Sequence, residues 1–308
     1  MRQLGSRNFL QEAYILFVLV VSTLVFFTLP QIIFAANIYF TSSSQNFYTD
    51  DTFIVEARID SEENINVVEG SFSFNKNVLN AKELSTGGSV FSLWAQQPSF
   101  SNDDGTIYFV GGTPEGFQGQ NKLILKAVFV AKNEGESKIA FVNDTVAFLS
   151  DGKGTKIQLI KNPLAISIFP KPKDVSPKDE WEASRQSDNI KPEFKEATIS
   201  RDYRLFNNQY FVSFFATDID SGVAYYEIKE GDGEFKKVKS PHVLFDQTLN
   251  TKIYIKVVDN AGNESIVSPE VGPEPVITPS ATYLFWIIGL LFLLFVAFMI
   301  KRFVNRKI

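Results

Sequence analysis

The chain has 308 residues, no cysteine and a formal net charge of −5 at pH 7. Without cysteine it can form neither disulfides nor thiolate metal sites, so its folded parts depend on apolar cores, which 30 Phe and 10 Tyr can supply. The mildly acidic charge disfavours nucleic acid as a partner, because phosphate binding requires a basic surface.

Residues 1–36 have the pattern of a signal peptide. Two arginines precede an apolar stretch from Ala13 to Phe27, Pro30 interrupts it, and Ala36 offers a small residue for cleavage. The alternative interpretation is an uncleaved first membrane helix. Both interpretations place the middle of the chain outside the cell.

Residues 37–169 alternate apolar and polar side chains. In the stretch from Thr52 to Asp60, every second residue from Phe53 to Ile59 is apolar, and Thr52, Glu56, Arg58 and Asp60 form the opposite, polar face. A period of two indicates strands with one buried face, and clusters of Gly, Asp, Asn and Ser separate them. We therefore predict an all-β, antiparallel sandwich or barrel.

One strand of this region suggests a binding surface. If Phe72 and Phe74 face the core, their polar neighbours face outward. Aromatic side chains anchor protein interfaces and stack on sugars, which adds Trp94 as a second aromatic candidate. The candidate partner-binding residues are Glu69, Ser71, Ser73 and Tyr108. An ordinary solvated strand face is the alternative.

Four segments then occur in a recognisable order, at 37–67, 67–84, 103–112 and 119–143. The second reads "VVEGSFSFNKNVLNAKEL" and the fourth "GQNKLILKAVFVAKNEGESKIAFVN". In this order they resemble cohesin domains, the dockerin-binding modules of cellulosome scaffolds. The resemblance implies a jelly-roll sandwich, shared with some carbohydrate-binding modules, and a dockerin-type partner. The polar pair that commonly meets dockerin falls near Val67 and Glu69, of which Glu69 alone is polar here.

Residues 170–189 are rich in Pro and in charges of both signs, and they contain one isolated tryptophan, Trp181. This composition predicts an extended linker. Short strands resume over 190–270, with a hairpin signal at Gly231–Gly233. They suit a small immunoglobulin-like (Ig-like) sandwich.

Two motifs of this second module resemble bacterial Ig-like repeats of surface proteins, in which such a module is usually a spacer. The first is "A-x-D-x-x-S-G-V", beginning at Ala216, and the second is "V-x-D-x-A-G-N", beginning at Val257. The Pro-rich residues 271–280 then predict a stiff stalk.

Residues 281–300 predict a single transmembrane helix. The run from Tyr283 to Ile300 is uncharged, and a basic tail over 301–308 follows it. The positive-inside rule places this tail in the cytoplasm. The expected location is therefore the cell membrane, single-pass, with the bulk of the chain extracellular.

Candidate chemistry is sparse. His242 is the one histidine and lies in an apparent loop. Paired aspartates at 50–51 and 103–104 occur in turn contexts, where aspartate commonly bonds the local backbone. "DIDSG", from Asp218, begins like a calcium loop, but Lys229 takes the twelfth position, where a bidentate carboxylate is needed. We expect no enzyme, no cofactor and no metal ligands, and the sequence leaves calcium open through other oxygens.

The leading hypothesis is a membrane-anchored, extracellular, non-catalytic binding protein whose cohesin-like module docks a protein partner of the dockerin type. A second hypothesis is a carbohydrate-binding module for cell-wall or environmental polysaccharide, which predicts a row of exposed aromatic side chains. A third is a purely structural surface stalk.

Overall fold

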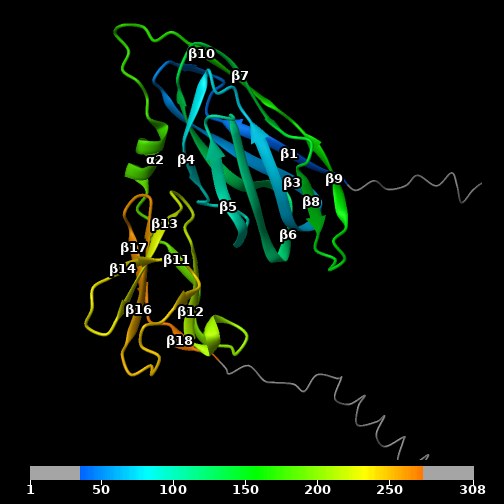
Figure 1. The fold of residues 1–308 in the computed structure, drawn as a ribbon. Helices are drawn as coiled ribbons and strands as arrows, with labels where there is room; N and C mark the ends of the chain where they lie inside the picture. Colours follow the sequence, from blue (N-terminus) through cyan, green and yellow to red (C-terminus); the bar gives the residue numbers. More distant parts are fainter. Residues whose placement is uncertain (1–34, 273–308) are drawn as a thin grey trace, which may run out of the picture. The chain divides into compact units, whose positions relative to one another are not determined.

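The computed structural model describes residues 35–272 (Figure 1). Chain contacts divide these residues into two compact units. The first takes in the described residues up to Ile190 together with Asp218–Val223, and the second takes in Lys191–Thr217 and the residues from Ala224. The predicted signal peptide, except for its last two residues, and the predicted membrane span lie outside the described residues. Within them, no helix has the length and apolar character needed to cross a membrane.

Ten strands build the first unit, and hydrogen bonds link them all in one network (Figure 1). They are β1 (Ala35–Ser42), β2 (Asn46–Tyr48), β3 (Thr52–Ser73), β4 (Leu79–Ser85), β5 (Leu93–Ser101), β6 (Thr106–Ala131), β7 (Gly135–Phe141), β8 (Val146–Leu149), β9 (Lys156–Lys161) and β10 (Leu164–Phe169). The all-β prediction is confirmed, and this unit is consistent with the expected jelly roll. β1 begins two residues before the predicted module boundary.

The long strands β3 and β6 pair antiparallel and pass through both layers of the sandwich. Their register shifts several times between Ala57 and Val67, and such bulges bend paired strands. In the first layer, Ile65–Ser73 pairs with the start of β6, whose other side carries β5, and with β8. In the second layer, Thr52–Ile59 pairs with the end of β6, whose other side carries β4, and with β1.

The core between the layers follows the predicted alternation. Phe53 and Ile59 are buried, as are Val55 and Ala57 between them along the strand. Aromatic rings from different strands pack against one another: Phe40 stacks on Phe141 with ring centroids 4.3 Å apart. The predicted core face of this strand is therefore confirmed.

The predicted linker contains a helix, α2 (Glu180–Ser187), and the expectation of an extended segment is wrong there. Asp179 caps its N-terminus by accepting a hydrogen bond from the Glu182 amide, 2.8 Å. Trp181 is 0% exposed, and its Nε1 donates to Glu83 Oε2 at 2.8 Å. The isolated tryptophan thus supplies the buried apolar contact of this segment with the first unit.

The outer side of the second layer is covered by the chain itself. The register pairs Val128 with Ile54, and the residues on either side of each of them face the core. Val128 therefore faces outward, but it is 0% exposed. Helix α2 lies over this region, and a carboxylate oxygen of Glu180 accepts from the Ile54 amide at 3.3 Å.

Asp218–Val223 also pack on this layer as part of the first unit. The Ser85 hydroxyl donates to the Ser221 carbonyl at 2.7 Å, and the Gly88 amide donates to the Asp218 carbonyl at 2.9 Å. Gly87 permits this approach, because a Cβ there would lie 2.4 Å from the Asp220 carbonyl oxygen. The contact therefore requires glycine.

The second unit consists of two four-stranded sheets, in the orders β15-β12-β11-β18 and β14-β13-β16-β17, with an apolar core that draws on both. Its elements are β11 (Glu193–Arg201), the 3₁₀ helix η1 (Phe206–Asn208), β12 (Tyr210–Thr217), β13 (Val223–Glu230), β14 (Lys236–Val238), β15 (His242–Val243), β16 (Ile253–Asp259), β17 (Glu264–Val267) and β18 (Glu270–Val271).

The predicted hairpin is confirmed, because β13 and β14 pair antiparallel. His242 was expected in a loop but belongs to the short strand β15, which pairs with β12. β18 extends the strands by one residue into the predicted stalk. The Ig-like assignment stays a prediction.

Candidate protein interface

The four candidate binding residues share one surface of the first layer. The register pairs Glu69 with Val110 and Ser71 with Tyr108. Directly opposed residues of an antiparallel pair project to the same side. Phe72 is buried on the other side, so the predicted outward orientation of Glu69, Ser71 and Ser73 is confirmed.

We call this surface the outer face. It spans β5, β6, β3 and β8, with pairings that bring Leu93, Val67 and Phe148 into the same surface. Its side chains are Val67, Glu69, Ser71, Ser73, Leu93, Gln96, Ser99, Thr106, Tyr108, Val110, Val146 and Phe148.

The polar centre of the outer face is a hydrogen bond. Tyr108 donates its hydroxyl to Glu69 Oε1 at 3.2 Å. Desolvation and this hydrogen bond to Glu69 raise the pKa of Tyr108 above its usual value. The Glu69 carboxylate retains lone pairs with which to accept from a partner.

The two serines lie nearer one margin of the outer face. The carbonyl of Ser71 accepts from the Thr145 hydroxyl at 3.1 Å, and Ser73 pairs with Ala140 of β7. Both serines are half-buried by these neighbours. They can support a partner at the edge of a contact, whereas Glu69 and Tyr108 offer their side chains more fully.

The apolar part of the outer face was missed from the sequence. Leu93 is 52% exposed, and Val67, Val110, Val146 and Phe148 are half-buried. The cohesin resemblance had already named Val67 together with Glu69. The other members depend on which strands pair and in which register, and no local pattern shows that.

Trp94 was proposed as an exposed aromatic contact, and this is wrong. It pairs with Gly111, whose neighbours along β6 are outward residues, so its ring turns toward the core. The ring lies edge-on to Phe91 and Phe109, with centroids 5.3 and 6.5 Å away. A Cβ at Gly111 would come within 2.7 Å of the indole, so the glycine makes room for it.

The paired aspartates serve turns, as predicted. Asp51 is buried and accepts from the amides of Tyr48 and Lys178, both at 2.8 Å. Asp104 accepts from the Ser101 hydroxyl at 2.7 Å. These bonds define the loop conformation at both pairs.

Asp218 also forms the turn that was expected in place of a calcium loop. Its Oδ1 accepts from the amides of Asp220 at 3.1 Å and Gly222 at 2.7 Å. In the same unit, Asp188 accepts from the Ile190 amide at 2.9 Å and the Ser221 amide at 3.0 Å. Burial opposes ionisation of Asp188, but the hydrogen bonds from Ser221 and Ile190 hold its pKa below the usual value.

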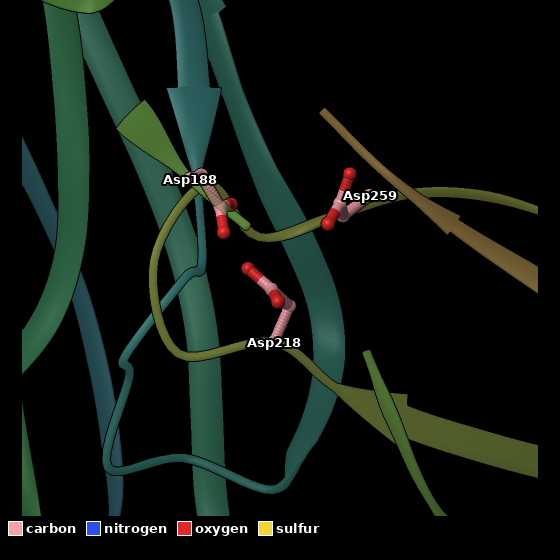
Figure 2. Close-up of side chains that lie close together, drawn as sticks. All are labelled: Asp188, Asp218 and Asp259. Atoms are coloured by element: carbon pink, nitrogen blue, oxygen red, sulfur yellow. The ribbon is translucent and has the colours of Figure 1, made fainter. Parts of the chain in front are cut away.

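Figure 2 shows the carboxylates of Asp188 and Asp218 turned toward each other, with one oxygen of each within 4.8 Å of the other. The figure also labels Asp259, which belongs to the second unit. Within that unit, Asp259 Oδ1 accepts from the amides of Ala261 and Asn263 at 2.9 and 2.7 Å. The "V-x-D-x-A-G-N" motif is therefore a turn organised by its aspartate.

No protein-family model matches the chain, and no curated protein matches it. Among solved structures, it is similar to the seventh ScaB type I cohesin from Pseudobacteroides cellulosolvens, at 14% identity, over 47% of this chain and 98% of that one, with a TM-score of 0.38. A non-cellulosomal cohesin from Archaeoglobus fulgidus matches at 14% identity, over 44% and 91%, with a TM-score of 0.36. A type I cohesin–dockerin complex from Clostridium thermocellum matches at 12% identity, over 46% and 97%, with a TM-score of 0.36. All three are cohesin structures, the family that the motifs of residues 37–169 resemble.

Proposed function

We propose that this chain is a non-catalytic binding protein whose first unit docks a folded protein partner of the dockerin type on the outer face. Two supports meet at the same residues. The sequence motifs resemble those of cohesin domains, and Glu69 lies where that family's dockerin-contacting polar pair falls. The geometry around Glu69 then has the character of a protein interface.

The observation that carries the proposal is the difference between the two outer sides of the first unit. The second layer is covered by α2 and by Asp218–Val223. On the first layer, Leu93 and Tyr108 are exposed. Exposed apolar and aromatic side chains, with hydrogen-bonding groups among them, are typical of protein interfaces.

The outer face also has a suitable size. Four strands at ~4.8 Å spacing give a width of roughly 19 Å, and a mean of about seven residues at ~3.3 Å gives a length of roughly 23 Å, although β8 has only 4 residues. A standard interface buries about 800 Å² on each partner. In projection the face alone gives about 440 Å², so a partner has to contact the loops at its margins as well.

The edge of the layer is less suited to binding than its face. β5 carries Pro98, and its pairing with β6 is interrupted by bulges on both sides of Gln96. Proline and bulges block the addition of another strand. We therefore place the partner over the face and not along the β5 edge.

The polysaccharide alternative has less support. A sugar-binding platform would present a row of aromatic rings. On the outer face, the aromatic side chains among the described residues are Tyr108 and the half-buried Phe148, and Trp94 turns toward the core. Two rings on non-adjacent strands do not form such a row.

The anchor is a second part of the proposal and is based on sequence. The uncharged run from Tyr283 to Ile300, followed by the basic tail, supports a single-pass protein with its two units outside the cell and its C-terminus in the cytoplasm. Protease added to intact cells should remove both units. Survival of both units in sealed cells would contradict this orientation.

The interface is tested with residues 35–272 against a panel of dockerin-type modules, by surface plasmon resonance. Val110→Lys replaces an apolar side chain at the centre of the outer face by a long charged one, and we expect at least about a tenfold loss of affinity, equivalent to ~1.4 kcal/mol. Val175→Lys is the matched control, because Val175 is a partly exposed valine between β10 and α2.

Two results would refute the interface. The first is that no module of the panel binds. The second is that Val110→Lys and Val175→Lys bind equally well, which would place the partner elsewhere. Retention of glycans alone on an array would favour the polysaccharide alternative.

A further inference from the structure

The second unit carries an exposed apolar cluster on two loops. We call it the apolar tip and define it as Tyr203, Leu205, Phe206 and Phe245. Their exposed fractions are 61%, 48%, 39% and 94%. Single exposed apolar residues are ordinary, but four on adjoining loops mark an interaction site.

The two loops lie side by side because they meet at the start of β12. The Tyr210 amide donates to Gln247 Oε1 at 2.7 Å, and Gln247 Nε2 donates back to the Tyr210 carbonyl at 3.1 Å. Leu244 also donates its amide to the Tyr210 carbonyl, at 3.0 Å. The loop that carries Phe245 is thus fixed beside the end of the loop that carries Tyr203 and Phe206.

The first of these loops has a defined backbone. Asp202 Oδ1 accepts from the Arg204 amide at 2.8 Å, and Arg201 Nε donates to the Asn208 carbonyl at 2.8 Å. Phe206 has a φ of +48°, which is rare for a bulky residue and is held there by the surrounding bonds. The loop therefore presents its apolar side chains from a fixed conformation.

The chain leaves the second unit at the same end as the apolar tip. β18 runs parallel to β11, pairing Val271 with Ile199, and β11 continues directly into the tip loop (Figure 1). In the sequence, residues 273–280 separate β18 from the apolar run that begins at Ala281. Fully extended at ~3.1 Å per residue, they span roughly 25 Å.

The charges near the tip are mixed. Arg204 pairs with Asp202, and the amides of Phe245 and Asp246 donate to the carboxylate of Glu230. Such a surface has no strong attraction for anionic lipids. Tyr, Phe and Leu, with arginine beside them, are instead the residues that partition into the headgroup region of a bilayer.

We propose that the apolar tip inserts into the headgroup region of the membrane that carries the C-terminal anchor, and so holds the second unit against the bilayer. This inference rests on the anchor of the proposed function. It gives the second unit a role of its own, which is to contact the membrane beside the anchor.

The test uses the full chain, whose lack of cysteine allows single labelled sites. Phe245→Cys is labelled with an environment-sensitive fluorophore, and the protein is reconstituted in phosphatidylcholine nanodiscs with and without a headgroup-proximal spin-labelled lipid. We expect quenching of about half of the emission, unchanged at high salt because insertion is apolar. Glu264→Cys is the control, since β17 and β18 lie toward opposite ends of the unit in Figure 1.

A second comparison tests the rest of the tip. Tyr203→Ser with Leu205→Ser should reduce the quenching at position 245 by at least about half, because the remaining apolar surface is too small to hold the tip. Ile266→Ser should leave it unchanged, since Ile266 is equally exposed but lies on β17.

The outcomes separate the two proposals. If the chain fails to co-purify with nanodiscs, the anchor fails and the inference fails with it. If the chain co-purifies and position 245 is not quenched, the inference alone is overturned. Equal quenching at position 264 overturns the inference in favour of non-specific contact with the lipid. An emission shift that depends on protein concentration without lipid overturns it in favour of contact with a second copy of the chain.

Discussion

Replacing Trp181 with alanine should destabilise the first unit by about 4 kcal/mol. A tryptophan side chain buries up to ~250 Å², worth about 6 kcal/mol at ~25 cal/mol per Å². Alanine keeps a small part of this, and substitutions of buried tryptophan by alanine cost ~3–5 kcal/mol. Because Trp181 is fully buried and bonded to Glu83, the upper half of that range applies.

The assay is guanidinium unfolding of residues 35–272. This segment contains two tryptophans, Trp94 and Trp181, so the variant leaves Trp94 as a fluorescence probe within the first unit. Far-UV circular dichroism follows both units together. Trp181→Phe is the matched variant, because it keeps most of the apolar contact and removes only the donor to Glu83, for which we expect a loss of about 1–3 kcal/mol.

A loss below about 1 kcal/mol for Trp181→Ala would refute the reasoning. It would mean that α2 does not pack firmly on the second layer. The outer side of that layer would then be open to a partner as well, and the asymmetry that selects the outer face would no longer hold.

Three further predictions follow from single contacts. Gly87→Ala should cost about 1–3 kcal/mol in the same unfolding assay, because its Cβ would meet the Asp220 carbonyl at 2.4 Å. Tyr108→Phe should change stability by less than about 0.5 kcal/mol, since its hydrogen bond is exposed, but should weaken partner binding measurably by plasmon resonance. Hydrogen bonds from the Arg204 side chain and from its backbone amide lower the pKa of Asp202 from 3.8 to about 2. The stabilisation that the ionised Asp202 contributes should therefore be present above about pH 4 and lost as pH falls through about 2. In Arg204→Gln, carboxyl NMR titration should show the pKa of Asp202 moving toward 3.8.

The strands and their buried faces could be predicted because both are local properties of the sequence. The alternation from Phe53 to Ile59 states which side of β3 is buried, and the same period around Phe72 places Glu69 and Ser71 outside. Partners across strands could not be predicted. Val110 and Leu93 share the outer face with Glu69 because of strand pairings between segments far apart in the chain. These pairings include β-bulges that no local pattern shows.

Helix α2 was missed although a signal for it was present. Asp179 followed three residues later by Glu182 is an N-terminal capping pattern, and the prolines and mixed charges around it outweighed this in the interpretation. The presence of Trp181 was a second indication that this segment packs on the protein, because a tryptophan is seldom left exposed in a solvated linker. Only its contact with Glu83, almost one hundred positions earlier, shows where it binds.

The membership of Asp218–Val223 in the first unit has a consequence for the order in which the protein matures. A chain made from its N-terminus reaches Ile190 before these residues exist, and at ~5–20 residues per second Val223 follows about 2 to 7 seconds later. Until then the backbone at Gly87 and Gly88 lacks its later partners. The first unit therefore cannot complete its folding before synthesis of the second unit is under way. The residues that complete the first unit, Asp218–Val223, are made together with those of the second.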